Sequence, residues 1–146
     1  MMGVVLFSSV LSTDVYAYSR TKASAYAKKY ATKYNKNFDS FDSDCTNFAS
    51  QCVNAGGISM NCIPDSKVKY KHLGEIYKTR SYWCSQKYKK SRTFLGIKIK
   101  TKVDFVTTST WSVVAKNQAD SFWGFYNYMR NNGASCKEYS VDTEKN

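Results

Sequence analysis

Cys45 stands where a helix is expected to begin, and its thiol is the side chain best suited to nucleophilic chemistry in this chain. Asp44 is a favoured N-cap residue and Gly56-Gly57 is a typical stop signal, so we predict a helix over 44–55. Its apolar stripe consists of Phe48, Ala49, Cys52 and Val53. Free N–H groups and the helix dipole at such a start favour the thiolate, which attacks carbonyl carbons. Cys45 is therefore a candidate nucleophile, although the same position would also suit a small buried side chain.

The run Asp-Cys-Thr-Asn-Phe-Ala-Ser-Gln-Cys over 44–52, followed by Gly56-Gly57, resembles the nucleophile helix of the putative amidase domain family. Those bacterial secreted proteins are similar to papain-like cysteine hydrolases. The resemblance extends upstream through 18–38, and more loosely through 109–111 and 125–133. It implies that Cys45 is the nucleophile. It also implies an α+β fold in which N-terminal helices precede an antiparallel sheet.

The base is the element of this resemblance that the sequence lacks. The family implies a Gly-Asp turn and then a His-Ser pair on a late strand, and neither precedes Asn146. We therefore expect a domain that is incomplete at its C-terminal end and weakly active or inactive alone, because a cysteine dyad needs an imidazole. The sole histidine, His72, is a candidate base. The alternative is a solvent-facing loop histidine, since it lies in a basic stretch and no Ser follows it.

The 146 residues fit one domain, which we place at 18–136, with a polar tail at 137–146. Alanines and tyrosines repeat with helical spacing over 19–35, where Ser19 is the expected cap. Apolar and charged residues alternate over 95–105, as in a strand with one charged face. A third helix is expected from Asn117 or Asp120 to Met129 or Arg130. Helices first and strands later indicate an α+β arrangement.

Residues 1–17 resemble a shortened export signal, with a cut after Ala17, although no Lys or Arg precedes the apolar run. A frayed apolar N-terminus is the alternative. An export signal predicts a secreted protein, and association with the cell wall is one form of this prediction. Secretion would place the cysteines in an oxidising environment. With Cys45 set aside, four cysteines allow three pairings, which the sequence leaves open: Cys52, Cys62, Cys84 and Cys136. Their spacing fits no metal site, so we expect neither metal nor cofactor.

Positive charge is concentrated in the centre of the chain. Residues 67–102 contain twelve Lys or Arg and one acid, Glu75, so this segment carries +11, the formal charge of the whole chain. Interleaved aromatic residues make it a candidate surface for anionic wall polymer or lipid headgroups. The residues expected to bind are Lys87, Lys89, Lys90, Arg92, Lys98, Lys100 and Lys102. An ordinary solvated face, or protection of a sheet edge, are the alternatives. No nucleic-acid motif accompanies the charge, which argues against that partner.

Two classes of function follow. The first is a secreted cysteine amidase or peptidase that acts on a cell-wall peptide or a protein amide, with backbone N–H groups holding the oxyanion. The second is a non-catalytic domain that binds anionic cell-surface polymer.

Overall fold

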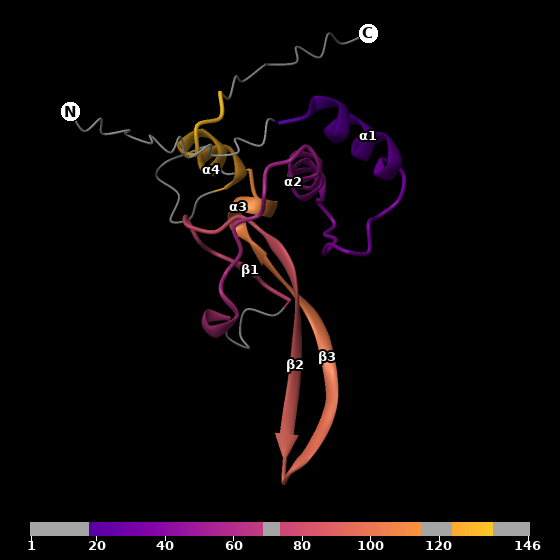
Figure 1. Cartoon of the computed structure of the whole chain (residues 1–146), viewed down its shortest axis with the longest axis vertical. Coiled ribbons are helices and arrows are strands. Elements are labelled where there is room, and N and C mark those ends of the chain that lie inside the picture. Colours follow the sequence, from indigo (N-terminus) through magenta and orange to yellow (C-terminus); the bar gives the residue numbers. More distant parts are fainter. Residues whose placement is uncertain (1–17, 69–73, 115–123, 136–146) are drawn as a thin grey trace, which may run out of the picture.

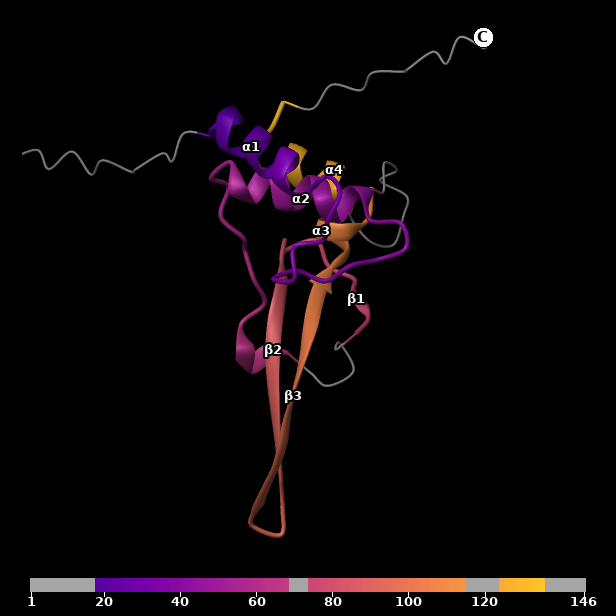
Figure 2. The same ribbon diagram turned by 90° about the vertical axis from the view of Figure 1, so that its right-hand side faces the viewer.

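A computed structural model describes residues 18–68, 74–114 and 124–135. Helices gather at one end of the molecule and a long β-hairpin projects from them, as Figures 1 and 2 show from two directions. The elements are α1 (Arg20–Tyr30), α2 (Cys45–Ala55), a 3₁₀ turn η1 (Asp65–Lys67), β1 (Ile76–Tyr77), β2 (Ser85–Phe94), β3 (Ile97–Thr108), α3 (Ser109–Ser112) and α4 (Phe125–Asn131). The mixed α+β class predicted from the sequence is confirmed.

The first helix begins as predicted and ends early. The Ser19 hydroxyl accepts a hydrogen bond from the Lys22 N–H (3.3 Å), which is the expected cap. The helix stops at Tyr30 instead of continuing to 35. Asn35 helps to explain the stop, because its amide accepts from the Asn37 N–H (3.1 Å) and donates to the Tyr26 hydroxyl (2.8 Å). Such local bonds compete with helix propagation and fold the following residues into a loop against α1.

The second helix matches its predicted range but buries a different face. The buried residues of α2 are Thr46, Asn47, Ser50 and Gln51, whereas the predicted apolar stripe is only partly buried. Two tryptophans explain this arrangement. Trp111 donates from its indole to Asn47 Oδ1 (2.6 Å), and Trp83 donates to the Ser50 hydroxyl (3.2 Å). Asn47 and Ser50 can face the core because each accepts a hydrogen bond from a buried indole.

The apolar core lies beneath α2. Trp83, Trp111, Tyr128 and Met129 form one buried cluster, in which the two tryptophan rings are 4.7 Å apart between centroids. A second cluster of Ile63, Val68 and Val106 lies at the base of the hairpin. Together they join the helical end to the sheet.

The sheet has the order β1-β3-β2. The predicted strand over 95–105 is observed as β3, shifted to 97–108, and its partner β2 was not predicted. β2 pairs antiparallel with β3, as in the antiparallel sheet that was expected, whereas the two-residue β1 adds a short parallel pairing to β3. β1 and the start of β2 both pair with the C-terminal end of β3, where Tyr77 is opposite Thr108 and Ser85 is opposite Thr107. Residues 78–84 connect β1 to β2 at this end of the sheet, so the two strands run in opposite directions along β3.

The C-terminal helix is observed as α4 (Phe125–Asn131), and Gly124, which the predicted range included, is its N-cap. α4 begins at Phe125, directly after Gly124, and part of the predicted range, 117–123, lies outside the described residues. Phe125 N–H donates to the Val113 carbonyl (2.7 Å), so the backbone at Gly124 passes close against 113–114, and a Cβ there would collide with Val113 and Val114. Glycine is therefore required at this approach. Across the described segments, no helix has the length and apolarity needed to span a membrane.

Candidate functional site

Cys45 is the first residue of α2 and its side chain is exposed. Asp44 occupies the N-cap position, yet its carboxylate makes no capping hydrogen bond. Asp44 Oδ1 instead accepts from the Phe41 N–H (3.0 Å) and from Asn47 Nδ2 (2.7 Å). The carboxylate is thereby directed to the preceding loop, and it leaves the first N–H groups of α2 uncapped by this side chain.

Asn47 holds the start of α2 in place through three hydrogen bonds. Its amide nitrogen donates to the Asp44 carboxylate and to the Asp39 carbonyl (2.8 Å), while its oxygen accepts from Trp111. One turn later, the Ser50 hydroxyl donates to the Trp111 carbonyl (2.7 Å). Trp111 belongs to the short stretch 109–111 that the family resemblance singled out, but the sequence offered no signal that Asn47 would be its partner.

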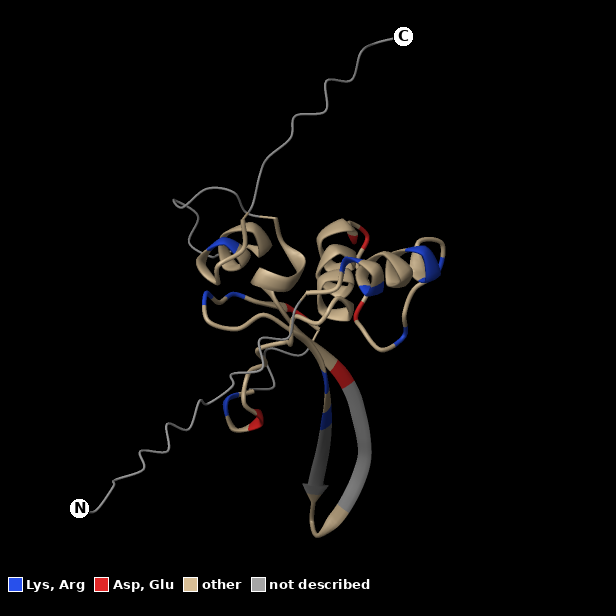
Figure 3. Ribbon diagram, turned by 45° about the horizontal axis from the view of Figure 1, so that its top comes forward, with Lys and Arg blue, Asp and Glu red and all other residues tan. Residues whose placement is uncertain are grey.

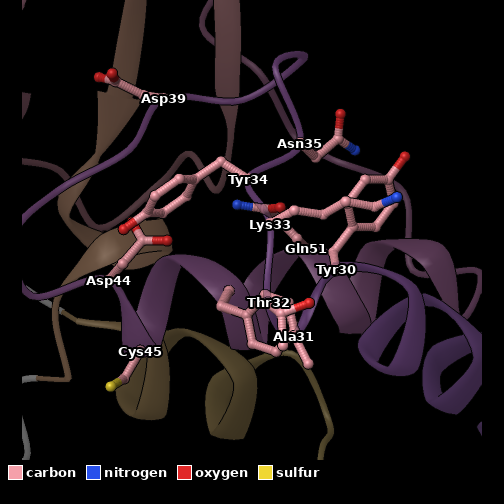
Figure 4. A pocket seen from close by; sticks show the side chains of 11 residues that line it. Tyr30, Ala31, Thr32, Lys33, Tyr34, Asn35, Asp39, Asp44, Cys45 and Gln51 are labelled. Carbon is pink, nitrogen blue, oxygen red and sulfur yellow. The ribbon is translucent and has the colours of Figure 1, made fainter.

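A cavity of about 370 Å³ lies beside this helix start. The loop after α1 forms one wall and α2 forms the other, as Figure 4 shows. Its lining combines aromatic rings, two acids, one cation and two amides, contributed by Tyr30, Ala31, Thr32, Lys33, Tyr34, Asn35, Asp39, Asp44, Cys45, Phe48 and Gln51. In Figure 4 the sulfur of Cys45 is directed away from Tyr34 and Asn35, so the thiol is at the rim of the cavity. Sequence reasoning missed the loop residues of this wall.

Asp39 is an acid in the lining of the cavity, and its pKa is shifted. Burial raises the pKa of the Asp39 carboxyl, the Ser40 N–H that bonds it lowers that pKa, and the carboxylates of Asp104 and Asp44 raise it. The pKa of Asp39 is raised overall, because burial and the nearby negative charges both disfavour its anion. In Figure 4, Asp39 and Cys45 lie at opposite edges of the set of labelled lining residues. Asp39 is therefore not assigned as a general acid for the Cys45 nucleophile.

The other described cysteines are free thiols in more enclosed positions. Burial raises the pKa of Cys52 on α2. Cys62 and Cys84 hydrogen-bond to each other, which lowers the pKa of Cys62 and raises that of Cys84, and burial raises the pKa of Cys84 further. Cys136 lies outside the described residues, so the three pairings stay a prediction.

His72 also lies outside the described residues, and the segments that the structure does describe contain no histidine. Within those segments, no group of three His, Cys, Asp or Glu side chains is arranged to hold a metal ion. Of the predicted cations, Lys87 and Lys89 lie on the described part of β2, and Lys87 Nζ is 5.6 Å from the centre of the Phe105 ring.

The amino-acid sequence matches a known family. The chain belongs to the putative amidase domain family, whose model matches residues 17–146. Two curated relatives, both from Bacillus subtilis (strain 168), are the uncharacterized proteins YjcM and YhbB. YjcM is 51% identical over 49 residues, which is 33% of this chain and 12% of YjcM. YhbB is 42% identical over 50 residues, which is 34% of this chain and 16% of YhbB. The chain therefore matches only a small part of either relative, and no solved structure matches it.

Proposed function

We propose that this chain is a cysteine-dependent amidase in which Cys45 is the nucleophile. Membership of the family supports a general amidase-like function. The observation that carries the assignment to Cys45 is its exposed thiol at the first residue of an 11-residue helix, on the rim of a cavity. A nucleophile needs this combination of access to substrate and nearby donors.

In the proposed reaction, the Cys45 thiolate attacks the amide carbon and the carbonyl oxygen becomes an oxyanion at the N-terminus of α2. N–H groups left uncapped by Asp44 stabilise that charge. The C–N bond then breaks, the amine leaves with a proton from a general acid, and water hydrolyses the thioester. His72, the sole histidine of the sequence, is the candidate for the general acid and general base. Aromatic rings and amide groups in the cavity suit a peptide, from cell wall or protein.

Acylation by p-nitrophenyl acetate tests the nucleophile without needing the base. p-Nitrophenolate leaves without protonation, so attack by the thiolate gives a thioester even where proton transfer is slow. We expect a burst of about one p-nitrophenolate per chain, with the acetyl group found on the peptide that contains Cys45. Cys45→Ala should abolish the burst, whereas Cys52→Ala, on the same helix, should keep it.

A comparison with N-acetylcysteine separates catalysis from simple exposure. Per thiolate, Cys45 should react about tenfold faster or more, because oxyanion donors are worth that factor or greater. An equal rate, or acetyl groups found mainly on Cys62 or Cys84, would contradict the proposal. Hydrolysis of a peptide p-nitroanilide that both Cys45→Ala and His72→Ala abolish would assign His72 as the base.

A further inference from the structure

The tip of the β2–β3 hairpin carries the most exposed cluster of apolar side chains in the described residues. Phe94 is 66% exposed, Leu95 is 86% exposed and Ile97 is 70% exposed. They surround a two-residue turn, Leu95-Gly96, which joins the strands. Figures 1 and 2 both place this tip at the far end of the molecule from the helices. Three large apolar groups at one projecting point mark an interaction site more often than a neutral surface.

The turn itself disfavours the residue found there. Leu95 has φ 49° and Gly96 has φ 76°. A tight hairpin turn with two positive φ values prefers Asn-Gly, and leucine is strained in this region because of its Cβ. Leu95 is the only residue other than glycine with positive φ among those that the structure describes. The chain thus holds an apolar side chain at the outermost position although another residue would stabilise the turn.

Positive charge flanks the apolar tip. The two strands and their turn contain seven Lys or Arg and one acid, Asp104, a net charge of +6 over 85–108. Figure 3 shows blue segments on the described part of β2. The backbone register pairs Lys90 with Lys102, so the excess of positive charge is carried by both strands. An anionic partner along the hairpin would be attracted to this excess charge.

We propose that this hairpin tip inserts Phe94, Leu95 and Ile97 into the surface of an anionic lipid bilayer, with the flanking lysines and arginine at the phosphate level. Apolar side chains gain from the acyl region while cations pair with headgroups, which is the general design of interfacial membrane anchors. A soluble polyanion would satisfy the charge but offer no apolar phase to the tip. A second copy of the hairpin would be repelled, since both carry +6.

This orientation keeps the amidase-like end free. A strand of 10 residues extends about 30 Å, so the bilayer would lie roughly that far below the base of the hairpin. The inference uses none of the residues around Cys45, and its failure would leave the proposed function untouched.

Vesicle sedimentation of the whole chain tests the proposal. The vesicles contain phosphatidylcholine alone or with about 30% phosphatidylglycerol. The tip variant combines Phe94→Thr, Leu95→Asn and Ile97→Thr, which keeps strand-forming residues and installs the preferred Asn-Gly turn. Val114→Thr is the matched control, because it removes an apolar residue that is 49% exposed away from the hairpin.

We expect the wild-type chain to bind the anionic vesicles and the tip variant to bind them about tenfold or more weakly, while Val114→Thr is unchanged. Replacing Lys87, Lys89, Lys90 and Arg92 with Gln should also weaken binding and flatten its dependence on salt. Soluble polyphosphate provides the polymer arm, and the tip variant should bind it as the wild type does.

Equal vesicle binding by the wild type and the tip variant would overturn the proposal and leave a purely electrostatic surface. Tighter binding to polyphosphate than to vesicles would favour an anionic polymer instead. Self-association that the tip variant abolishes, without vesicle binding, would indicate a second copy as the partner. As a direct readout, Phe94→Trp should be quenched by brominated acyl chains, and an absence of quenching in bound protein would also overturn insertion.

Discussion

At the scale of single residues, the four described cysteines are chemically distinct. Cys45 is exposed, Cys52 and Cys62 are partly buried, and Cys84 is completely buried. Access and the position at a helix start therefore both favour Cys45, whereas Cys62 competes because its hydrogen bond from Cys84 lowers its pKa. The comparison between Cys45 and Cys62 is consequently the informative one.

We expect iodoacetamide to alkylate Cys45 first in the reduced, folded protein, and Cys84 last, between about pH 5 and pH 9. Peptide mass spectrometry at short labelling times gives the rate for each thiol. Urea-unfolded protein is the control, in which the differences should largely disappear. Slower labelling of Cys45 than of Cys62 or Cys84 at every pH would remove the support that reactivity gives to a nucleophile.

At the scale of elements, local signals predicted some features and distant contacts decided others. The Ser19 cap and the range of α2 follow from residues close in sequence, so they could be predicted. The buried face of α2 could not, because Asn47 and Ser50 find their partners in Trp111 and Trp83. These lie 64 and 33 residues away.

The hairpin also could not be predicted fully from local sequence, because its second strand and its turn depend on strand pairing. The residues of β2 alternate weakly between apolar and polar, and the strand forms because β3 pairs with it along both sides of one irregularity between Lys90 and Arg92. Leu95 was assigned to the strand by its apolar side chain, since a leucine gives no signal for a turn with positive φ. The loop wall of the cavity was missed for a related reason, as loop positions carry no periodic pattern.

Replacing Asn47 with Ala should destabilise the link between α2 and α3. The buried Trp111 indole would lose its acceptor and Asp44 would lose a donor, so we expect a loss of about 2–4 kcal/mol in the free energy of unfolding. Urea unfolding followed by tryptophan fluorescence measures it. Asn54→Ala is the matched control on the same helix, because Asn54 makes one exposed bond, to the Ile58 carbonyl, and should cost under about 1 kcal/mol. Equal losses in the two variants would show that the Asn47 network adds nothing beyond an ordinary helix position.

At the scale of the whole molecule, the two proposed activities lie at opposite ends of one body. The cavity beside Cys45 is formed by α1, α2 and their connecting loop, and the apolar tip lies at the end of the hairpin (Figure 1). Between them, the segment after α2 joins the start of β2 through paired bonds between Asn61 and Trp83 (2.8 and 3.1 Å).

Cys62 and Cys84 lie at this junction, directly after Asn61 and Trp83, and their thiols are in contact. Ile63 and Trp83 belong to the two apolar clusters, so a bond between the cysteines would connect both cores. We expect oxidised glutathione to convert the pair to a disulfide in a Cys45→Ala background. The half-buried Cys62 thiolate attacks the glutathione disulfide, then Cys84 displaces the second glutathione, and two protein thiols are oxidised as one disulfide is reduced.

The cross-link should stabilise the fold by about 3 kcal/mol, because it closes a loop of roughly 20 residues in the unfolded chain. For a chain of this size, that corresponds to a rise of roughly 5–10 °C in the melting temperature. Non-reducing peptide mapping identifies the bond, and calorimetry before and after dithiothreitol measures the shift. Cys62→Ser in the same background is the control and should show no shift. A glutathione adduct that persists on Cys62 would mean that Cys84 cannot reach it, and a cross-link without a change in melting temperature would mean that native strain offsets the loss of chain entropy.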